Sequence, residues 1–161
     1  MESFDYTPVR TIPARNASRL RIEAVGPERL DVIRTMNRSI FREERIINTF
    51  ERDDLVMLLA WHDDTPVGFK VGYRENRFIF YSAKGGVIPS FRRQGVATAL
   101  LSEMAECATG MGYRRFAFDT FPNLHPGMTI MALKSGFRLI KSDYNTVYRE
   151  YRLRFEMALD S

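Results

Sequence analysis

The sequence predicts an α/β protein built around a mixed, mostly antiparallel central sheet flanked by helices. Strand-like and helix-like apolar periods follow one another in the order β-α-α-β-β-β-α-β-α-β-β, and neither a repeat nor a linker interrupts them. The 161 residues, of which 45% are hydrophobic and 12% aromatic, suit one domain with a substantial core. We therefore expect a single domain over 19–161. An extended or loosely ordered segment over 1–18, polar and containing Pro8 and Pro13, precedes it.

In the first half of the chain, the sequence predicts short strands and helices. Residues 19–25 alternate between polar and apolar side chains, as a half-buried strand does, and Gly26-Pro27 ends them. Apolar residues at helical spacing predict a helix near 30–41, and a second helical piece is expected over 43–50. Apolar runs bounded by turn signals predict three further strands, over 55–62, 67–73 and 78–87.

The second half alternates helices with strands. Apolar side chains recur every three or four residues over 96–111, which predicts a helix with glycines at its end. A strand is expected over 114–121, and a short helix after it begins at Pro126. The closing pair of strands is expected over 137–142 and 148–157.

The most informative motif runs from Val87 to Thr98, from a strand end through a Pro-containing turn into a helix. The unpaired amides and the positive dipole end of a helix N-terminus attract anions. Gly95 and Ala97 keep the side chains small where an anion would approach the backbone, and Arg92 and Arg93 add positive charge. The pattern predicts a pyrophosphate site.

This motif resembles the acetyl-CoA signature of the GCN5-related N-acetyltransferases, the GNAT superfamily. The family pattern is Val-x-Pro-x-x-Arg-x-x-Gly-x-Gly/Ala followed by a Leu-rich helix. The residues that fall on it are Val87, Pro89, Arg92, Gly95, Ala97 and Leu100. Lys134-Ser135-Gly136-Phe137 resembles the Lys-x-Gly-Phe that closes the family's fourth helix. The resemblance spans about Leu20 to Met157, and the order of elements is also the GNAT order.

The resemblance implies acetyl-CoA as the co-substrate and transfer of its acetyl group to a primary amine by direct attack in a ternary complex. A small molecule and a peptide both remain open as the acceptor. The backbone of Val87 and Ile88 is implied to hold the pantetheine arm as an extra strand would, and Asn123 to contact that arm. The residues expected at the pyrophosphate are Arg92, Arg93, Gln94, Gly95, Val96, Ala97 and Thr98.

Two positions at which many family members carry catalytic side chains hold alanine here. A Glu on the fourth strand corresponds to Ala83, and a Tyr aimed at the coenzyme A sulfur corresponds to Ala132. The thiolate of a thiol with a pKa of about 8.5 is a tolerable leaving group, so this Tyr is helpful rather than obligatory. These departures leave a second reading open, in which the protein is a catalytically silent acyl-CoA-binding or sensing module. The candidate substitutes for the Tyr are Tyr144, Tyr148 and Tyr151.

Three side chains are the candidates for the general base: Asp119, Glu44 and His125. Asp119 follows Phe118 where the fifth strand of the family fold should reach the cleft. Glu44, with Glu43 beside it, equally suits a solvated helix face. His125 equally suits a cap of the next helix, and a water chain would serve in place of all three.

The charge and hydropathy of the chain limit the classes of binding partner that we expect. A net charge of +4 and a pI near 9.4 fit either an anionic partner or an Arg-rich surface. The sequence has no basic run with interleaved aromatics, so nucleic acid is not expected. No apolar run approaches the roughly 18 residues of a membrane span, so no membrane is expected either.

The few cysteines and histidines bear on whether disulfides or metal sites are expected. The lone Cys107 can form no internal disulfide, which is consistent with a cytoplasmic location. His62 and His125 stand far apart, and no Cys/His cluster has metal-ligand spacing, so no metal is expected. The closing strands offer edges through which a homodimer would form.

Overall fold

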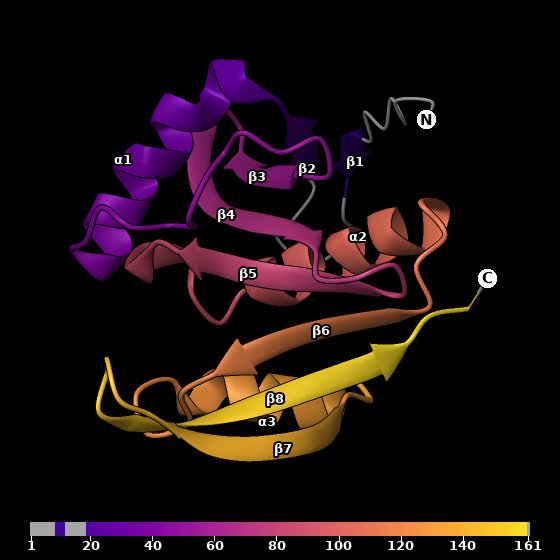
Figure 1. The fold of residues 1–161 in the computed structure, drawn as a ribbon. Helices are drawn as coiled ribbons and strands as arrows, with labels where there is room; N and C mark the ends of the chain where they lie inside the picture. The colour runs from indigo at the N-terminus through magenta and orange to yellow at the C-terminus, as the bar shows by residue number, and fades with distance from the viewer. Residues whose placement is uncertain (1–8, 12–18, 161) are drawn as a thin grey trace.

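A computed structural model of the chain describes residues 9–11 and 19–160. Its centre is an eight-stranded sheet with the order β1-β2-β3-β4-β5-β6-β8-β7 (Figure 1). The strands are β1 (Val9–Thr11), β2 (Leu20–Val25), β3 (Val56–His62), β4 (Thr65–Arg74), β5 (Ile79–Val87), β6 (Arg115–Thr120), β7 (Arg138–Asn145) and β8 (Glu150–Ala158). The helices are α1 (Leu30–Phe41), α2 (Val96–Gly110) and α3 (Pro126–Lys134), with 3-10 turns at Pro27–Arg29 and Pro89–Phe91.

The sheet is antiparallel at every pair of neighbouring strands except β5 and β6, which run parallel. Helix α2 lies in the connection between these two strands, because parallel neighbours need a crossover. The predicted α/β fold with a mixed, mostly antiparallel sheet is thereby confirmed. The predicted strands from β2 onward agree with the observed ones to within a few residues at each end.

The helices bury a separate core on each face of the sheet. On one face α1 packs over β3 and β4, and Ile33 and Phe69 belong to the same buried cluster. On the other face α2 and α3 lie together, and Leu100 and Ala132 join Phe80 in one apolar cluster. Figure 1 shows α3 behind β8 and β7, with no drawn helix in front of them. The part of the sheet formed by β6, β8 and β7 is thus covered on one face and open on the other.

The segment after α1 differs from the sequence-based expectation. The helix predicted over 43–50 is absent, and residues 42–55 form an irregular loop. Arg42 ends α1 in the left-handed conformation, with φ of 55°. The fully buried amide of Asn37 then donates to the carbonyls of Glu43 and Arg45, at 2.8 Å and 3.4 Å. These bonds hold carbonyls that a helix would need for itself, so the loop is fixed without helical hydrogen bonds.

The predicted lead-in is described only in part. Val9–Thr11 forms β1, which pairs antiparallel with β2 and adds an edge to the sheet. The other residues of the segment 1–18 lie outside the described residues.

Asn37→Ala should destabilise the protein by about 1–3 kcal/mol, because two loop carbonyls lose a buried donor. Urea denaturation measures the loss. The matched control is Asn48→Ala in the same loop, where the side chain is exposed and its effect should stay within about 0.5 kcal/mol. Equal denaturation midpoints for the two variants would contradict this role of Asn37.

Candidate active site

The two parallel strands separate partway along their length and leave one edge of β5 open. They pair from Ile79 with Arg115 up to Ser82 with Phe118, whereas β5 continues to Val87. The register between β4 and β5 shifts at Val71/Gly72, which leaves Ala83 as an extra residue in β5. Figure 1 shows the arrowheads of β5 and β6 pointing apart. We call the region where the two strands diverge, made of residues 83–88 and the end of β6, the fork.

Beyond Ser82, β5 pairs with no described strand on the side of the fork. Ile88 N–H donates to Val67 on β4 at 2.9 Å, so Ile88 faces away from the fork. Because successive residues of a strand point their N–H and C=O groups to opposite sides, Val87 faces the fork. Its carbonyl accepts a hydrogen bond from Nε of Arg92 at 3.2 Å. An extended chain lying in the fork would meet this edge as a further strand meets a sheet.

The open edge leads to the N-terminus of α2. Gly95 precedes the helix with φ of 83°, and a Cβ built there would meet nothing within 4 Å. The first helical bond is donated by Ala99 to Gly95 at 3.0 Å, so the amides of Val96, Ala97 and Thr98 come before it. Amides that precede the first helical bond, together with the helix dipole, attract anions.

The side chains predicted at the pyrophosphate lie in different environments. Arg92 and Arg93 are both exposed beside the helix start, but Arg92 also bonds to Val87. Gln94 donates to the carbonyl of Ser90 at 3.2 Å and so fixes the turn. Asn123 lies in the loop after β6, and its Nδ2 donates to Glu150 Oε2 at 3.0 Å. The turn itself is the part that lies directly at the helix N-terminus.

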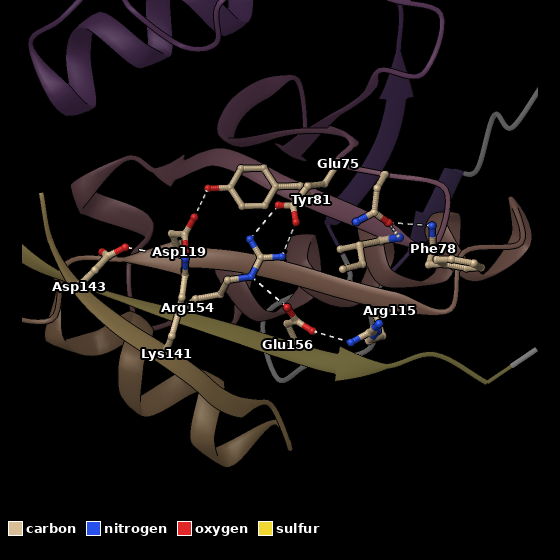
Figure 2. A network of polar contacts seen from close by, with 11 residues as sticks. Glu75, Phe78, Tyr81, Arg115, Asp119, Lys141, Asp143, Arg154 and Glu156 are labelled. Carbon is tan, nitrogen blue, oxygen red and sulfur yellow. Dashed lines mark hydrogen bonds and ion pairs between the residues drawn. The ribbon is translucent and has the colours of Figure 1, made fainter.

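Asp119 is the candidate base that lies closest to the inner end of the fork. It follows Phe118, the last residue of β6 that pairs with β5, and its side chain lies on the open face of the sheet (Figure 2). Tyr81 on β5 donates its hydroxyl to Asp119 Oδ2 at 2.5 Å. Burial and the neighbouring Asp119 charge raise the pKa of Tyr81 well above its usual value, so the hydroxyl stays a donor.

Glu44 is not brought to the fork. Its Oε1 accepts from Nε of Arg38 at 2.7 Å, and 72% of its side chain is exposed. Glu43 is the residue of this pair that turns inward, where it forms an ion pair with Lys84 on the open part of β5. The solvated-face reading therefore applies to Glu44, and sequence reasoning assigned no role to Lys84.

His125 lies at the outer end of the fork. It immediately precedes α3, without a side-chain cap bond, and its exposed ring meets Phe41 edge-on at 6.4 Å between centroids. Phe41 in turn lies against Gly86 of β5, where a Cβ would come within 2.9 Å of its ring. His125 thus reaches from the β6–α3 connection toward α1 and the open part of β5.

A ladder of charges fixes the open face of the sheet around Asp119. Arg154 on β8 stands opposite Asp119 in register and binds Glu75 at 2.6 Å and Glu156 at 3.0 Å (Figure 2). The bonds to these carboxylates raise the pKa of Arg154, which stays charged. Arg152 pairs with Asp143 at 3.0 Å and joins β8 to β7. The ladder connects β8 to β7 and to the β4–β5 turn, and so positions Asp119 on a rigid surface.

A buried Lys–Ser pair lies on the helix-covered face beside the fork. Nζ of Lys70, a residue only 6% exposed, donates to Oγ of Ser82 at 3.0 Å. Burial disfavours the charged form and lowers the pKa of Lys70 from 10.5 to about 8. The only sequence signal for this pair was a lysine in the middle of the apolar strand predicted over 67–73. Such a lysine is equally typical of a strand at the edge of a sheet.

The protein should become more stable between pH 8 and pH 10.5 because of Lys70. In that range the unfolded chain keeps a proton that the folded chain has released, so raising the pH favours the folded state. The gain is at most about 3–4 kcal/mol, at about 1.4 kcal/mol for each pKa unit. Urea denaturation of wild type and Lys70→Met at pH 7.5 and pH 10 measures it. A pH dependence that is the same in both proteins would contradict a lowered pKa of Lys70.

Comparison with known proteins agrees with this geometry. A model of the acetyltransferase (GNAT) family matches residues 27–137. The fold is similar to that of an IAA acetyltransferase from Bacillus cereus ATCC 14579, with a TM-score of 0.76 and 18% identity over 87% of this chain and 99% of that one. It is also similar to the ribosomal-protein-S18-alanine N-acetyltransferase from Escherichia coli, with a TM-score of 0.75 and 13% identity over 88% and 95% of the two chains.

A third similar structure is Arabidopsis thaliana NAA60 in complex with acetyl-CoA, with a TM-score of 0.71 and 16% identity over 88% of this chain and 99% of that one. No curated protein matches the sequence. Within residues 9–11 and 19–160, no helix is long and apolar enough to cross a membrane. The same residues contain no group of three or more His, Cys, Asp or Glu side chains that could hold a metal ion.

Proposed function

The chain belongs to the acetyltransferase (GNAT) family, and from this premise we propose that it transfers an acetyl group from acetyl-CoA to a primary amine by direct attack in a ternary complex. The observation that carries the proposal is the continuity of two sites. The edge of β5 from Ala83 to Val87, which pairs with no described strand on the side of the fork, leads through the turn at Pro89–Phe91 to the free amides at the start of α2. A ligand that has an extended amide-containing arm ending in a pyrophosphate would use both.

The length of the fork supports this placement. The six extended residues 83–88, five at the end of β5 and then Ile88, span about 20 Å at about 3.3 Å per residue. An extended pantetheine arm has two amides, which suit the unpaired N–H and C=O groups of this edge. With the pyrophosphate at Val96, Ala97 and Thr98, the thioester would lie toward the inner end, near Ser82 and Phe118.

Asp119 is the general base in this proposal. It lies at the inner end of the fork, on the open face of the sheet, and an amine approaching from that face would meet it beside the thioester. The amine nitrogen attacks the carbonyl carbon, the C–N bond forms, and the nitrogen gives its proton to Asp119. The C–S bond then breaks and coenzyme A leaves. Glu44 points to solvent, and His125 lies at the outer end of the fork.

The acceptor would enter between the loop after α1 and the β7–β8 turn. The loop contributes Glu43, paired with Lys84. The turn region contributes Tyr148, which packs on Phe121 at 5.2 Å between ring centroids. These groups offer one carboxylate, one ammonium and aromatic surface, which suit a small amine or a peptide end.

Calorimetric titration with acetyl-CoA, followed by a panel of primary amines, tests the proposal. The panel contains an alanyl peptide, a lysyl peptide, spermidine and free amino acids, and thiol release reports transfer. We expect micromolar binding and transfer to at least one amine. Binding without transfer to any amine favours the silent acyl-CoA-binding module. Absence of binding contradicts both.

A further inference from the structure

We propose that Ser82, supplied with a proton by Lys70, protonates the coenzyme A thiolate as it leaves. The inference rests on the proposed function, because it needs the thioester at the inner end of the fork. It assigns the role of proton donor at a site where the position of the family's Tyr is occupied by Ala132, which is fully buried on the same face of the sheet.

Ser82 and Lys70 both lie where the fork closes. Ser82 is the last residue of β5 that pairs with β6, so its side chain lies where the fork closes. A Cβ at Gly85, in the open part of β5, would lie 3.1 Å from the Lys70 ammonium. Nζ of Lys70 therefore lies between a residue of the closed part and a residue of the open part, across the extra residue Ala83.

Hydrogen-bond capacity is the second argument. The Ser82 hydroxyl accepts a bond from Lys70, and in the described part of the chain its own O–H proton has no acceptor. A hydroxyl that is buried and accepts from an ammonium has its donor free for a third group. At this place in the fork, that group would be the sulfur of the bound thioester.

The surroundings of Lys70 are the third argument. On this face α2 packs Leu100 over Gly68 and Met104 over Gly72, two residues to either side of Lys70. The buried titratable residues of α2 are Glu103 and Cys107. Among the described residues, Ser82 is the one hydrogen-bond partner of the ammonium, and burial is the cause of its lowered pKa. Burial without a neighbouring carboxylate destabilises the charged form of an ammonium, so it gives up a proton more easily than an ammonium in water does.

The proton balance is simple. When the C–S bond breaks, the sulfur keeps the electron pair and takes the proton from Ser82 Oγ. Ser82 recovers a proton from Lys70, which becomes neutral and is recharged from solvent after the products leave. Since the amine has given one proton to Asp119, the overall reaction neither gains nor loses a proton.

The thiol ionisation of bound coenzyme A tests the proposal without any acceptor. Thiolate absorbance is followed against pH for coenzyme A bound to wild type, Lys70→Met and Ser82→Ala, after calorimetry has shown binding. A free thiol has a pKa of about 8.5. We expect a pKa below this value for the thiol bound to the wild-type protein. On Lys70→Met the pKa of the bound thiol should be higher by about one unit, which makes it about a tenfold weaker acid. Ser82→Ala, which removes only a hydroxyl, keeps the test usable if Lys70→Met does not fold.

Turnover gives the second readout. Lys70→Met and Ser82→Ala should each lower kcat about 100-fold with the KM for acetyl-CoA little changed, and the double variant should be no worse than either. The exposed pair Lys141→Met and Ser102→Ala serves as the matched control. Equal thiol pKa values in wild type and both variants would overturn the inference while leaving acetyl-CoA binding intact. Failure of wild type to bind coenzyme A would overturn the proposed function as well.

Discussion

Gly95→Glu should weaken acetyl-CoA binding at least about 100-fold, which corresponds to about 2.7 kcal/mol. A Cβ at Gly95 would point into open space in front of α2, so the new carboxylate would occupy the anion site itself. Its charge would repel the pyrophosphate where the helix dipole now attracts it. Calorimetric titration with acetyl-CoA measures the loss.

A matched control separates this repulsion from backbone strain. Gly112, just past the other end of α2, also has a positive φ, 89° against 83° for Gly95, and also has open space at its Cβ. Gly112→Glu therefore imposes a similar strain of about 1–2 kcal/mol, but lies far from the fork. It should lower the melting temperature as Gly95→Glu does and leave binding unchanged. If both variants bind like wild type, the start of α2 is not the pyrophosphate site.

The backbone of the segment proposed to hold the cofactor could be predicted because it depends on local chemistry. A strand end, a turn with Pro89, and Gly95 ahead of a helix specify the fold of one continuous segment, and the structure reproduces it. The positive φ at Gly95 is the conformation that a glycine favours. The anion site follows from the helix N-terminus alone and needs no long-range contact.

The side-chain pairs that we propose for catalysis could not be predicted in the same way. Tyr81 and Asp119 are far apart in sequence and meet only because β5 and β6 pair in one particular register. Lys70 and Ser82 likewise depend on the register between β4 and β5, including its shift at Val71/Gly72. A one-residue change of register would send these side chains to the opposite face of the sheet. The apolar pattern of the sequence does not show which residues of two strands stand opposite each other.

The loop after α1 shows how a tertiary contact overrides a local pattern. The apolar spacing of Ile46, Ile47 and Phe50 predicts a helix, and all three do pack against the α1-covered core. The buried Asn37 decides the backbone by bonding to loop carbonyls. The sequence signal for this loop was Asn37, a polar residue on the apolar stripe of α1. A buried side-chain amide needs partners, and here the partners are backbone carbonyls of the loop.

Asp119→Asn should lower kcat for acetyl transfer about 10²–10⁴-fold and leave acetyl-CoA binding unchanged. The amide keeps an oxygen that can accept the Tyr81 hydroxyl, so the local structure should persist while the basic group is lost. Steady-state kinetics with the fastest amine of the panel measures kcat, and calorimetry measures binding.

Asp143→Asn provides the control for charge. Asp143 lies on β7 and pairs with Arg152, and the charge of Asp119 also acts on Arg152. Both variants therefore remove one negative charge from the same side of the sheet, but only Asp119 lies at the fork. A large loss of kcat in Asp119→Asn alone supports a base at the thioester. Similar small losses in both would mean that the carboxylate acts only through the local field, and His125 or a water chain would then be the base to test, since each can take the proton of the amine without Asp119.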